Sequence, residues 1–188
     1  MKSGMKALMV VGVVVVAALI IGGMYISWKN QLVRYDENCK QAWAQVESQM
    51  QRRLDLIPNL VETVKGYAAH ESDVFIQVTQ ARASVAGAAT PEAKIAADNQ
   101  LTSALSRLMV VVENYPDLKA NTNFLALQDE LAGTENRISV ERRRYNEAAQ
   151  LFNTKIRTFP LSLAAKGYKA APYFQAVEAA REAPKVKF

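Results

Sequence analysis

The first strong pattern along the chain is an apolar run of 20 residues, Ala7–Ile26, without a charged side chain. A helix of this length spans roughly 30 Å, which matches the hydrocarbon core of a bilayer. The side chains that bound the run are Lys6 on one side and Tyr25, Trp28 and Lys29 on the other. Aromatic rings and lysine ammonium groups at the ends of an apolar run are typical of a membrane interface.

Residues 1–29 are therefore predicted to form a retained transmembrane anchor. The alternative is a cleaved signal peptide. The run is longer than the apolar part of most signal peptides, and no clear cleavage motif precedes Ser27, so we favour the anchor. Basic residues are nearly balanced on the two sides of the run, so the positive-inside rule does not decide which membrane face holds the rest of the chain.

After the anchor, apolar residues recur in alternating steps of four and three from Cys39 to Val85. Twelve of the 14 positions in this series are apolar, a period of 3.5 residues that is typical of a coiled-coil seam. Pro58 lies inside the series and leaves its phase unchanged. The pattern therefore predicts one helix up to about Val85 with a kink at Pro58, where Asp55 is placed to cap a restarted helix.

Two further runs show the same spacing. Thr90 and the proline after it fit the start of a second helix that ends at Pro116. A third run extends from Thr122 to Phe159, and Leu161–Tyr168 is predicted as a short fourth helix. We predict an all-α fold, in which an N-terminal transmembrane helix continues into an antiparallel up-and-down bundle of three long helices plus a short C-terminal helix.

The predicted domains are the anchor at 1–29, a helical bundle at 30–168 and an irregular C-terminal tail at 169–188. The second helix, at about 39 Å, is too short to cover the first along its whole length. The stretch Leu32–Met50 is therefore expected to need a partner helix or a second copy of the chain. This mismatch predicts self-association or a partner helix.

Charge is distributed unevenly along the chain. The net charge is +5, but residues 155–188 hold 7 basic and 2 acidic side chains, whereas residues 30–154 hold 13 basic and 16 acidic ones. This is a polarity along the chain and not a basic face of the size of a duplex, so we expect no nucleic-acid partner. One cysteine excludes an intramolecular disulfide framework, and one histidine excludes multi-histidine metal motifs.

A few polar residues occupy predicted seam positions. They are Arg53 and Glu71 in the first run and Glu141 and Lys155 in the third. Polar seam residues lower stability but fix register and partner choice. We expect Arg53 and Glu71 to pair with charges of the third helix, such as Glu141 or Lys155, or with another subunit.

Candidate catalytic groups are few. His70 and Glu71 match half of a zinc-protease motif, but Val74 stands where the second histidine would have to be. The basic triplet Arg142–Arg144 is expected to form a solvated helix face, because consecutive residues spread around a helix. We predict no enzyme activity, no metal and no cofactor.

The segment RRLDLIPNLVETVKGYAAHE (Arg52–Glu71) closely resembles the signature of the LemA family of bacterial membrane-anchored proteins. Four more segments are similar to the family. They are Ala42–Gln49, Leu127–Thr154, Ile156–Pro160 and Ala171–Val186. Together with the anchor, the resemblance covers nearly the whole chain.

The resemblance implies a single-pass protein of the bacterial inner membrane with a helical bundle, and the usual expectation for the family places this bundle in the cytoplasm. It implies no catalytic residue. The sequence therefore favours a non-enzymatic membrane-anchored scaffold that contacts lipid and self-assembles or presents helix faces to partners. The alternative is an accessory or sensor module that docks on another membrane protein, such as a transporter, a protease or an envelope enzyme.

Overall fold

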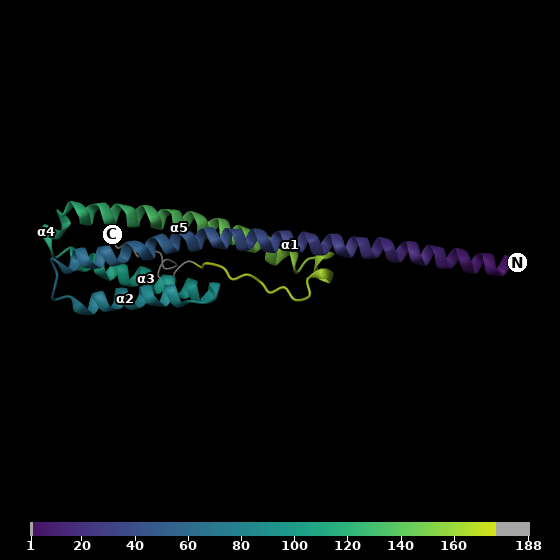
Figure 1. Ribbon diagram of the computed structural model, residues 1–188, viewed down its shortest axis with the longest axis horizontal. Coiled ribbons are helices and arrows are strands. Elements are labelled where there is room, and N and C mark those ends of the chain that lie inside the picture. The colour runs from purple at the N-terminus through teal and green to yellow at the C-terminus, as the bar shows by residue number, and fades with distance from the viewer. Residues whose placement is uncertain (1, 176–188) are drawn as a thin grey trace, which may run out of the picture. The chain divides into compact units, whose positions relative to one another are not determined.

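The computed structural model describes residues 2–175, with the side chains of residues 2, 3 and 5–7 excepted. Its helices are α1 (Lys2–Lys65), α2 (Ser72–Gly87), α3 (Pro91–Val112), α4 (Pro116–Lys119), α5 (Thr122–Lys155) and the 3-10 helix η1 (Leu161–Ala164). Over the described range there is no strand (Figure 1). The predicted all-α class is confirmed, and so is the long N-terminal apolar helix.

The segment predicted as one helix up to Val85 is in fact two helices. α1 ends at Lys65, the chain turns, and α2 begins at Ser72. Val64 and Val78 are both fully buried and belong to one core. The heptad phase continues across the turn because both helices contribute to this core, and a period does not reveal that the chain reverses direction. The structure thus has four long helices, α1, α2, α3 and α5, where we predicted three.

Pro58 lies inside α1 and does not end it. Proline lacks an N–H, so the carbonyl of Leu54, four residues earlier, loses its helical partner. Arg82 of α2 replaces that partner, because its Nε donates to the Leu54 oxygen at 2.9 Å. Asp55 accepts a hydrogen bond from Gln51 and α1 does not restart there, so the predicted cap is wrong. The kink at Pro58 stays a prediction.

The other helix boundaries follow local sequence signals. The Thr90 hydroxyl accepts from the backbone N–H of Ala93, with Pro91 in the first turn, as predicted. The side-chain oxygen of Asn121 accepts from two backbone N–H groups at the start of α5. α5 ends at Lys155, four residues before the predicted end at Phe159.

The described chain divides into two compact units. The first holds residues 2–42 and 147–171, and the second holds residues 43–146 and 172–175. In the second unit, the core joins α1, α2, α3, α4 and the start of α5. α2 and α3 pack side by side in it (Figure 1). Its fully buried members include Leu60, Val78, Leu101, Leu108 and Leu118.

The first unit has a smaller core around Leu32. Leu161 and Ala164 of η1 are buried against it, and Trp28 and Tyr35 pack at its border. Gly167 supports the turn after η1, since its φ of 97° lies in the left-handed region that favours glycine. The turn carries the Tyr168 ring to 5.9 Å from that of Phe152.

The expectation that the stretch Leu32–Met50 needs a partner is wrong. Leu32 and Cys39 are buried within the first unit, and Val46 and Met50 within the second. α5 and the segment after it cover parts of this stretch, since Leu161 packs on Leu32 in the first unit and Tyr145 meets Trp43 in the second. The length mismatch therefore carries no argument for self-association.

The apolar side chains at the start of α1 are exposed, unlike the buried ones of the stretch Leu32–Met50. The side chains from Leu8 to Ile26 are exposed, and Leu8, Leu19 and Ile21 exceed three-fifths exposure. By length and composition this helix is apolar enough to cross a membrane. Exposed apolar surface of this extent marks a surface that meets lipid or another protein.

Cys39 is a buried free thiol in the first unit. Burial, and then the nearby Asp36 carboxylate, raise the pKa of Cys39 above its ordinary value. Because the thiolate is the reactive form, we expect iodoacetamide at neutral pH to modify Cys39 at least about tenfold more slowly in the folded chain than in denaturant. Mass spectrometry of timed aliquots measures this. Equal rates in the two states would show that Cys39 is accessible.

Candidate functional site

The most distinctive polar feature of the second unit is a buried charge cluster. Arg53 of α1, Asp98 of α3 and Arg142 and Glu135 of α5 form it. Asp98 is 1% exposed and Arg53 is 5% exposed. Three helices therefore meet at one carboxylate, which is the most deeply buried charge among the described residues.

Each member of the charge cluster has a defined partner. Arg53 Nη1 lies 3.3 Å from Asp98 Oδ1 and 2.9 Å from Glu135 Oε2. Arg53 Nη2 donates to the Thr102 hydroxyl at 3.2 Å. Arg142 Nη2 donates to the other oxygen of Asp98. The cluster thus links α1, α3 and α5 through directional bonds in addition to apolar contacts.

Two electrostatic effects act on the pKa of Asp98 in opposite directions. Burial raises the pKa of Asp98, and the positive charges of Arg142 and Arg53 oppose this effect. A buried carboxylate between two guanidinium groups is costly to desolvate and also costly to leave unpaired. Since the guanidinium groups of this cluster are engaged with carboxylates or a hydroxyl, the arrangement fits a structural role better than a catalytic one.

The predicted seam residues take other partners than expected. Arg53 pairs with α5 through Glu135, not through Glu141 or Lys155. Glu141 pairs with Arg144 on its own helix at 2.7 Å. Glu71, expected to meet a cation, accepts from the Tyr115 hydroxyl at 3.2 Å. Burial, and then the hydrogen bond to Glu71, raise the pKa of Tyr115.

Lys155 belongs to the first unit, where its ammonium lies 5.7 Å from the centre of the Tyr35 ring. It therefore makes a cation–π contact with α1 in place of a carboxylate pair. Arg53 does pair with a charge of the third predicted helix, through Glu135, but the named partners Glu141 and Lys155 are wrong, and Glu71 bonds Tyr115 in place of a charge of that helix. The role of these residues in setting helix register stays a prediction.

Sequence reasoning missed Asp98 and misjudged Arg142. The 4-3 spacing of the second run begins at Leu101, and one step of three before it is Asp98, so the period could have identified it. Arg142 was expected on a solvated face, but its side chain is only 22% exposed. Its neighbours Arg143 and Arg144 are exposed, as expected.

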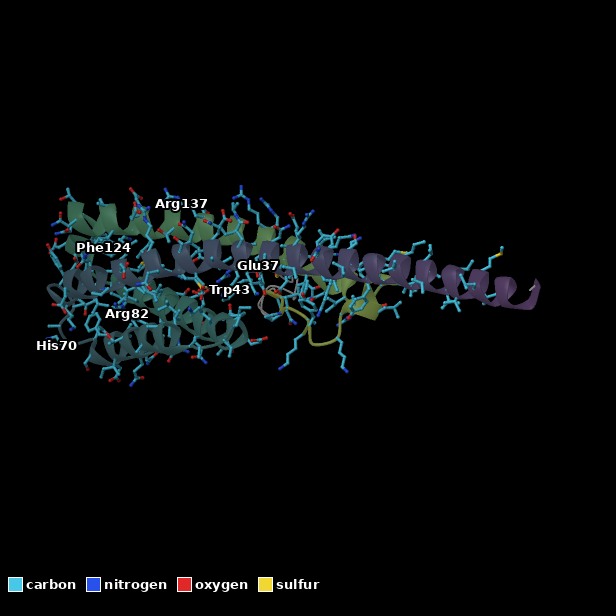
Figure 2. The ribbon with its side chains drawn as sticks, turned by 45° about the vertical axis from the view of Figure 1, so that its right-hand side comes forward. Glu37, Trp43, His70, Arg82, Phe124 and Arg137 are labelled. Atoms are coloured by element: carbon cyan, nitrogen blue, oxygen red, sulfur yellow. The ribbon has the colours of Figure 1, made fainter. Side chains whose placement is uncertain are left out.

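A second feature of this unit is an aromatic seat, formed by Trp43, Tyr145 and Phe174. The Phe174 ring stacks on that of Trp43 at 5.8 Å and meets that of Tyr145 edge-on at 5.7 Å. The guanidinium of Arg142 lies 4.9 Å from the centre of the Phe174 ring. Trp43 is labelled on α1 in Figure 2. Arg142 thus joins the charge cluster to the aromatic seat.

Two asparagines of α5 hold the tail by its backbone. In the second unit, Asn146 donates to the Phe174 carbonyl at 2.9 Å and accepts from its N–H at 3.0 Å. In the first unit, Asn153 makes the same reciprocal pair with Ala171, at 2.9 and 2.8 Å. A side-chain amide can donate through one N–H and accept through its oxygen at the same time, as the backbone of a neighbouring strand would. The residues 176–188 of the predicted tail lie outside the described residues.

Asn146→Ala removes both hydrogen bonds to Phe174 while leaving the aromatic seat intact. We expect a loss of about 1–2 kcal/mol of stability, because each such bond contributes about 1 kcal/mol net. Hydrogen exchange of the Phe174 amide should accelerate, and urea unfolding should measure the loss. Gln150→Ala on an exposed position of α5 is the control. An unchanged exchange rate in the Asn146 variant would contradict the assignment.

A family model for the LemA family matches residues 42–188. The chain belongs to the LemA family. The resemblance drawn from the Arg52–Glu71 segment is thereby confirmed.

Relatives of this LemA-family chain include proteins with two kinds of name. Magnetosome protein MamQ 2 of Paramagnetospirillum magneticum is 30% identical over 202 residues, covering 93% of this chain and 74% of the relative. Protein LemA of Metamycoplasma hominis is 28% identical over 137 residues, covering 72% of this chain and 63% of the relative. These names specify no reaction.

The remaining candidate residues of this LemA-family chain fall into two groups. Near the end of the apolar run, Tyr25 and Lys29 are exposed, and Trp28 is half-buried at the border of the Leu32 core. The side chain of Lys6 lies outside the described residues. His70 is exposed in the turn between α1 and α2 (Figure 2), and residues 2–175 hold no group of three side chains suited to a metal.

One open groove lies between the end of α1 and α2, in the second unit. It has a volume of about 500 Å³ and is lined by Lys65, Ala69, Ser72, Phe75, Ile76, Thr79 and Gln80. Ile76 is 52% exposed, and the Lys65 ammonium lies 5.9 Å from the centre of the Phe75 ring. The groove is open and largely apolar, and it has no acid–base pair that could carry out a reaction.

Proposed function

We propose that this protein is a non-enzymatic, membrane-anchored helical scaffold of the bacterial inner membrane. The observation that carries the proposal is α1, which is one helix from an exposed apolar run into the core of the bundle. A helix that spans a bilayer and continues without a linker tethers the chain that follows it to the membrane. Family membership supports the membrane setting, and the resemblance to the family favours a bundle in the cytoplasm.

The internal pairing of charges supports the non-enzymatic part of the proposal. Catalytic acids and bases need access to substrate. In the charge cluster, Asp98 is enclosed between Arg53 and Arg142. The bundle therefore interacts with other molecules through its surface. We assign the groove around Ile76 to self-assembly.

Mass photometry of the full chain in detergent tests this assignment. We expect a discrete species much larger than the 20.8 kDa chain and its micelle. Ile76→Glu should reduce this species, because a buried carboxylate without a partner is costly in an interface. Val110→Glu is the matched control, since Val110 is 69% exposed and lies outside the groove. Equal assembly of the wild type and the Ile76 variant would contradict the assignment of the groove.

The second candidate function is an accessory module that docks on another membrane protein. The exposure of Ile76 favours it equally, because an apolar groove suits a foreign helix as well as a second copy. A wild-type chain that is only monomeric or dimeric in detergent would favour docking over self-assembly. Crosslinking from the groove in intact membranes would then identify the partner.

A further inference from the structure

We propose that the segment Ile156–Lys169 is a second membrane contact, which lies in the interface beside the end of the transmembrane helix and prefers anionic lipid. This inference rests on the proposed membrane span in α1. It assigns a lipid-binding surface to a part of the chain that is distant from the anchor in sequence. Three observations within the first unit carry it.

The first observation is position. The Leu32 core holds Leu161 and Ala164 of η1 against α1, and Trp28 packs on the same cluster. Trp28 follows the apolar run by two residues, or about 3 Å along the helix, and Leu32 by six, or about 9 Å. The interfacial layer of a bilayer extends about 5–7 Å beyond the hydrocarbon on each side. The α1 residues that hold the segment thus lie about 3 to 9 Å beyond the hydrocarbon, from within the headgroup layer to just outside it. Figure 1 shows this yellow-green segment beside α1.

The second observation is exposed apolar surface. Phe159, in the turn before η1, is 79% exposed and Leu163 of η1 is 61% exposed, although Ile156, Leu161 and Ala164 beside them are packed in the Leu32 core. Phe159 is more exposed than any other aromatic side chain among the described large hydrophobic residues. Large apolar side chains at the level of an interface insert into the boundary between headgroups and acyl chains.

The third observation is charge. Residues 155–171 contain four basic side chains, Lys155, Arg157, Lys166 and Lys169, and no acidic one. Arg157, Lys166 and Lys169 are exposed. Basic side chains next to a membrane helix are attracted to anionic headgroups. Apolar side chains flanked by cations fit an anionic lipid surface better than they fit an uncharged protein face.

Depth-dependent quenching tests the proposal on the full chain in vesicles. Single cysteines replace Leu163, Val15 and Val110 in a Cys39→Ala background, and each carries a polarity-sensitive fluorophore. The quencher is a doxyl group on phosphatidylcholine. We expect quenching at position 163 to be several-fold stronger than at 110, a matched apolar position of α3 that is 69% exposed. Position 15, inside the span, should be quenched most.

Lipid composition tests the charge argument. Quenching at position 163 should be stronger in vesicles that contain phosphatidylglycerol than in phosphatidylcholine alone, and high salt should remove the difference. Arg157→Gln, Lys166→Gln and Lys169→Gln together should have the same effect as salt. These changes lie on exposed side chains and leave the Leu32 core intact.

The outcomes separate this inference from the proposal that α1 spans the membrane. An unquenched label at 15 would overturn the span and the inference together. A quenched label at 15 with a label at 163 no better quenched than at 110 would overturn the inference alone. A blue-shifted label at 163 that lipid does not quench would mean a protein contact, and would also overturn it. Equal quenching at 163 in neutral and anionic vesicles would overturn the preference for anionic lipid.

Discussion

Replacing Asp98 with alanine is expected to lower the free energy of unfolding by about 3–5 kcal/mol, the range for removing one partner from a buried ion pair. Asp98 is 1% exposed and contacts Arg53 and Arg142. Its removal leaves Arg53, itself 5% exposed, with Glu135 and Thr102 as its remaining partners. The loss is large because water cannot easily replace the carboxylate at this depth.

Urea unfolding followed by circular dichroism measures the effect of Asp98→Ala. The control is Glu135→Ala, because Glu135 belongs to the same cluster but its side chain is 41% exposed. Without Glu135, Arg53 keeps Asp98 and Thr102 as partners, so the control should lose clearly less stability than Asp98→Ala does. Equal losses in the two variants would show that burial of Asp98 does not dominate the energetics of the cluster.

The second large effect is expected at Arg82. Its Nε donates to the Leu54 carbonyl, which Pro58 leaves without a helical partner, and Leu54 is 4% exposed (Figure 2 labels Arg82 on α2). Arg82→Ala should cost about 1.5–3 kcal/mol, because a buried carbonyl then remains without a donor. If the freed Leu54 carbonyl causes this loss, the cost of Arg82→Ala depends on the presence of Pro58. A loss of side-chain packing would not depend on Pro58.

A double-mutant cycle tests that dependence. In a Pro58→Ala background, the N–H of residue 58 can donate to the Leu54 carbonyl, so Arg82→Ala should cost less than about 1 kcal/mol. Arg107→Ala is the control, since Arg107 bonds Gln77 at an exposed site and should show no coupling with Pro58. If the cost of Arg82→Ala is the same in both backgrounds, Arg82 acts through packing and not through the freed carbonyl.

Much of the core was predictable from the 3.5-residue period. Ile57, Leu60, Leu101, Leu108 and Ile138 lie at predicted seam positions and are buried. Thr90 was correctly predicted to cap α3. These features depend on neighbours three or four residues away on one helix, and such neighbours are visible in the sequence.

The candidate site was less predictable, because it depends on which helices meet. Arg53 was recognised as a polar seam residue, but its partners Asp98 and Glu135 come from two other helices. The sequence does not specify which of several carboxylates at similar spacing will lie opposite a given guanidinium. That choice depends on helix rotation and relative height, which packing of the whole core sets.

The sequence alone determined the all-α class and an apolar helix long enough to cross a membrane, because composition and period encode these directly. The family followed from the resemblance of the Arg52–Glu71 segment. The tertiary structure decided the rest. It showed that the chain reverses between Lys65 and Ser72 while the heptad phase continues, and that η1 covers Leu32. Both outcomes arise from contacts between segments distant in sequence, and a one-dimensional pattern records which residues are buried but not what buries them.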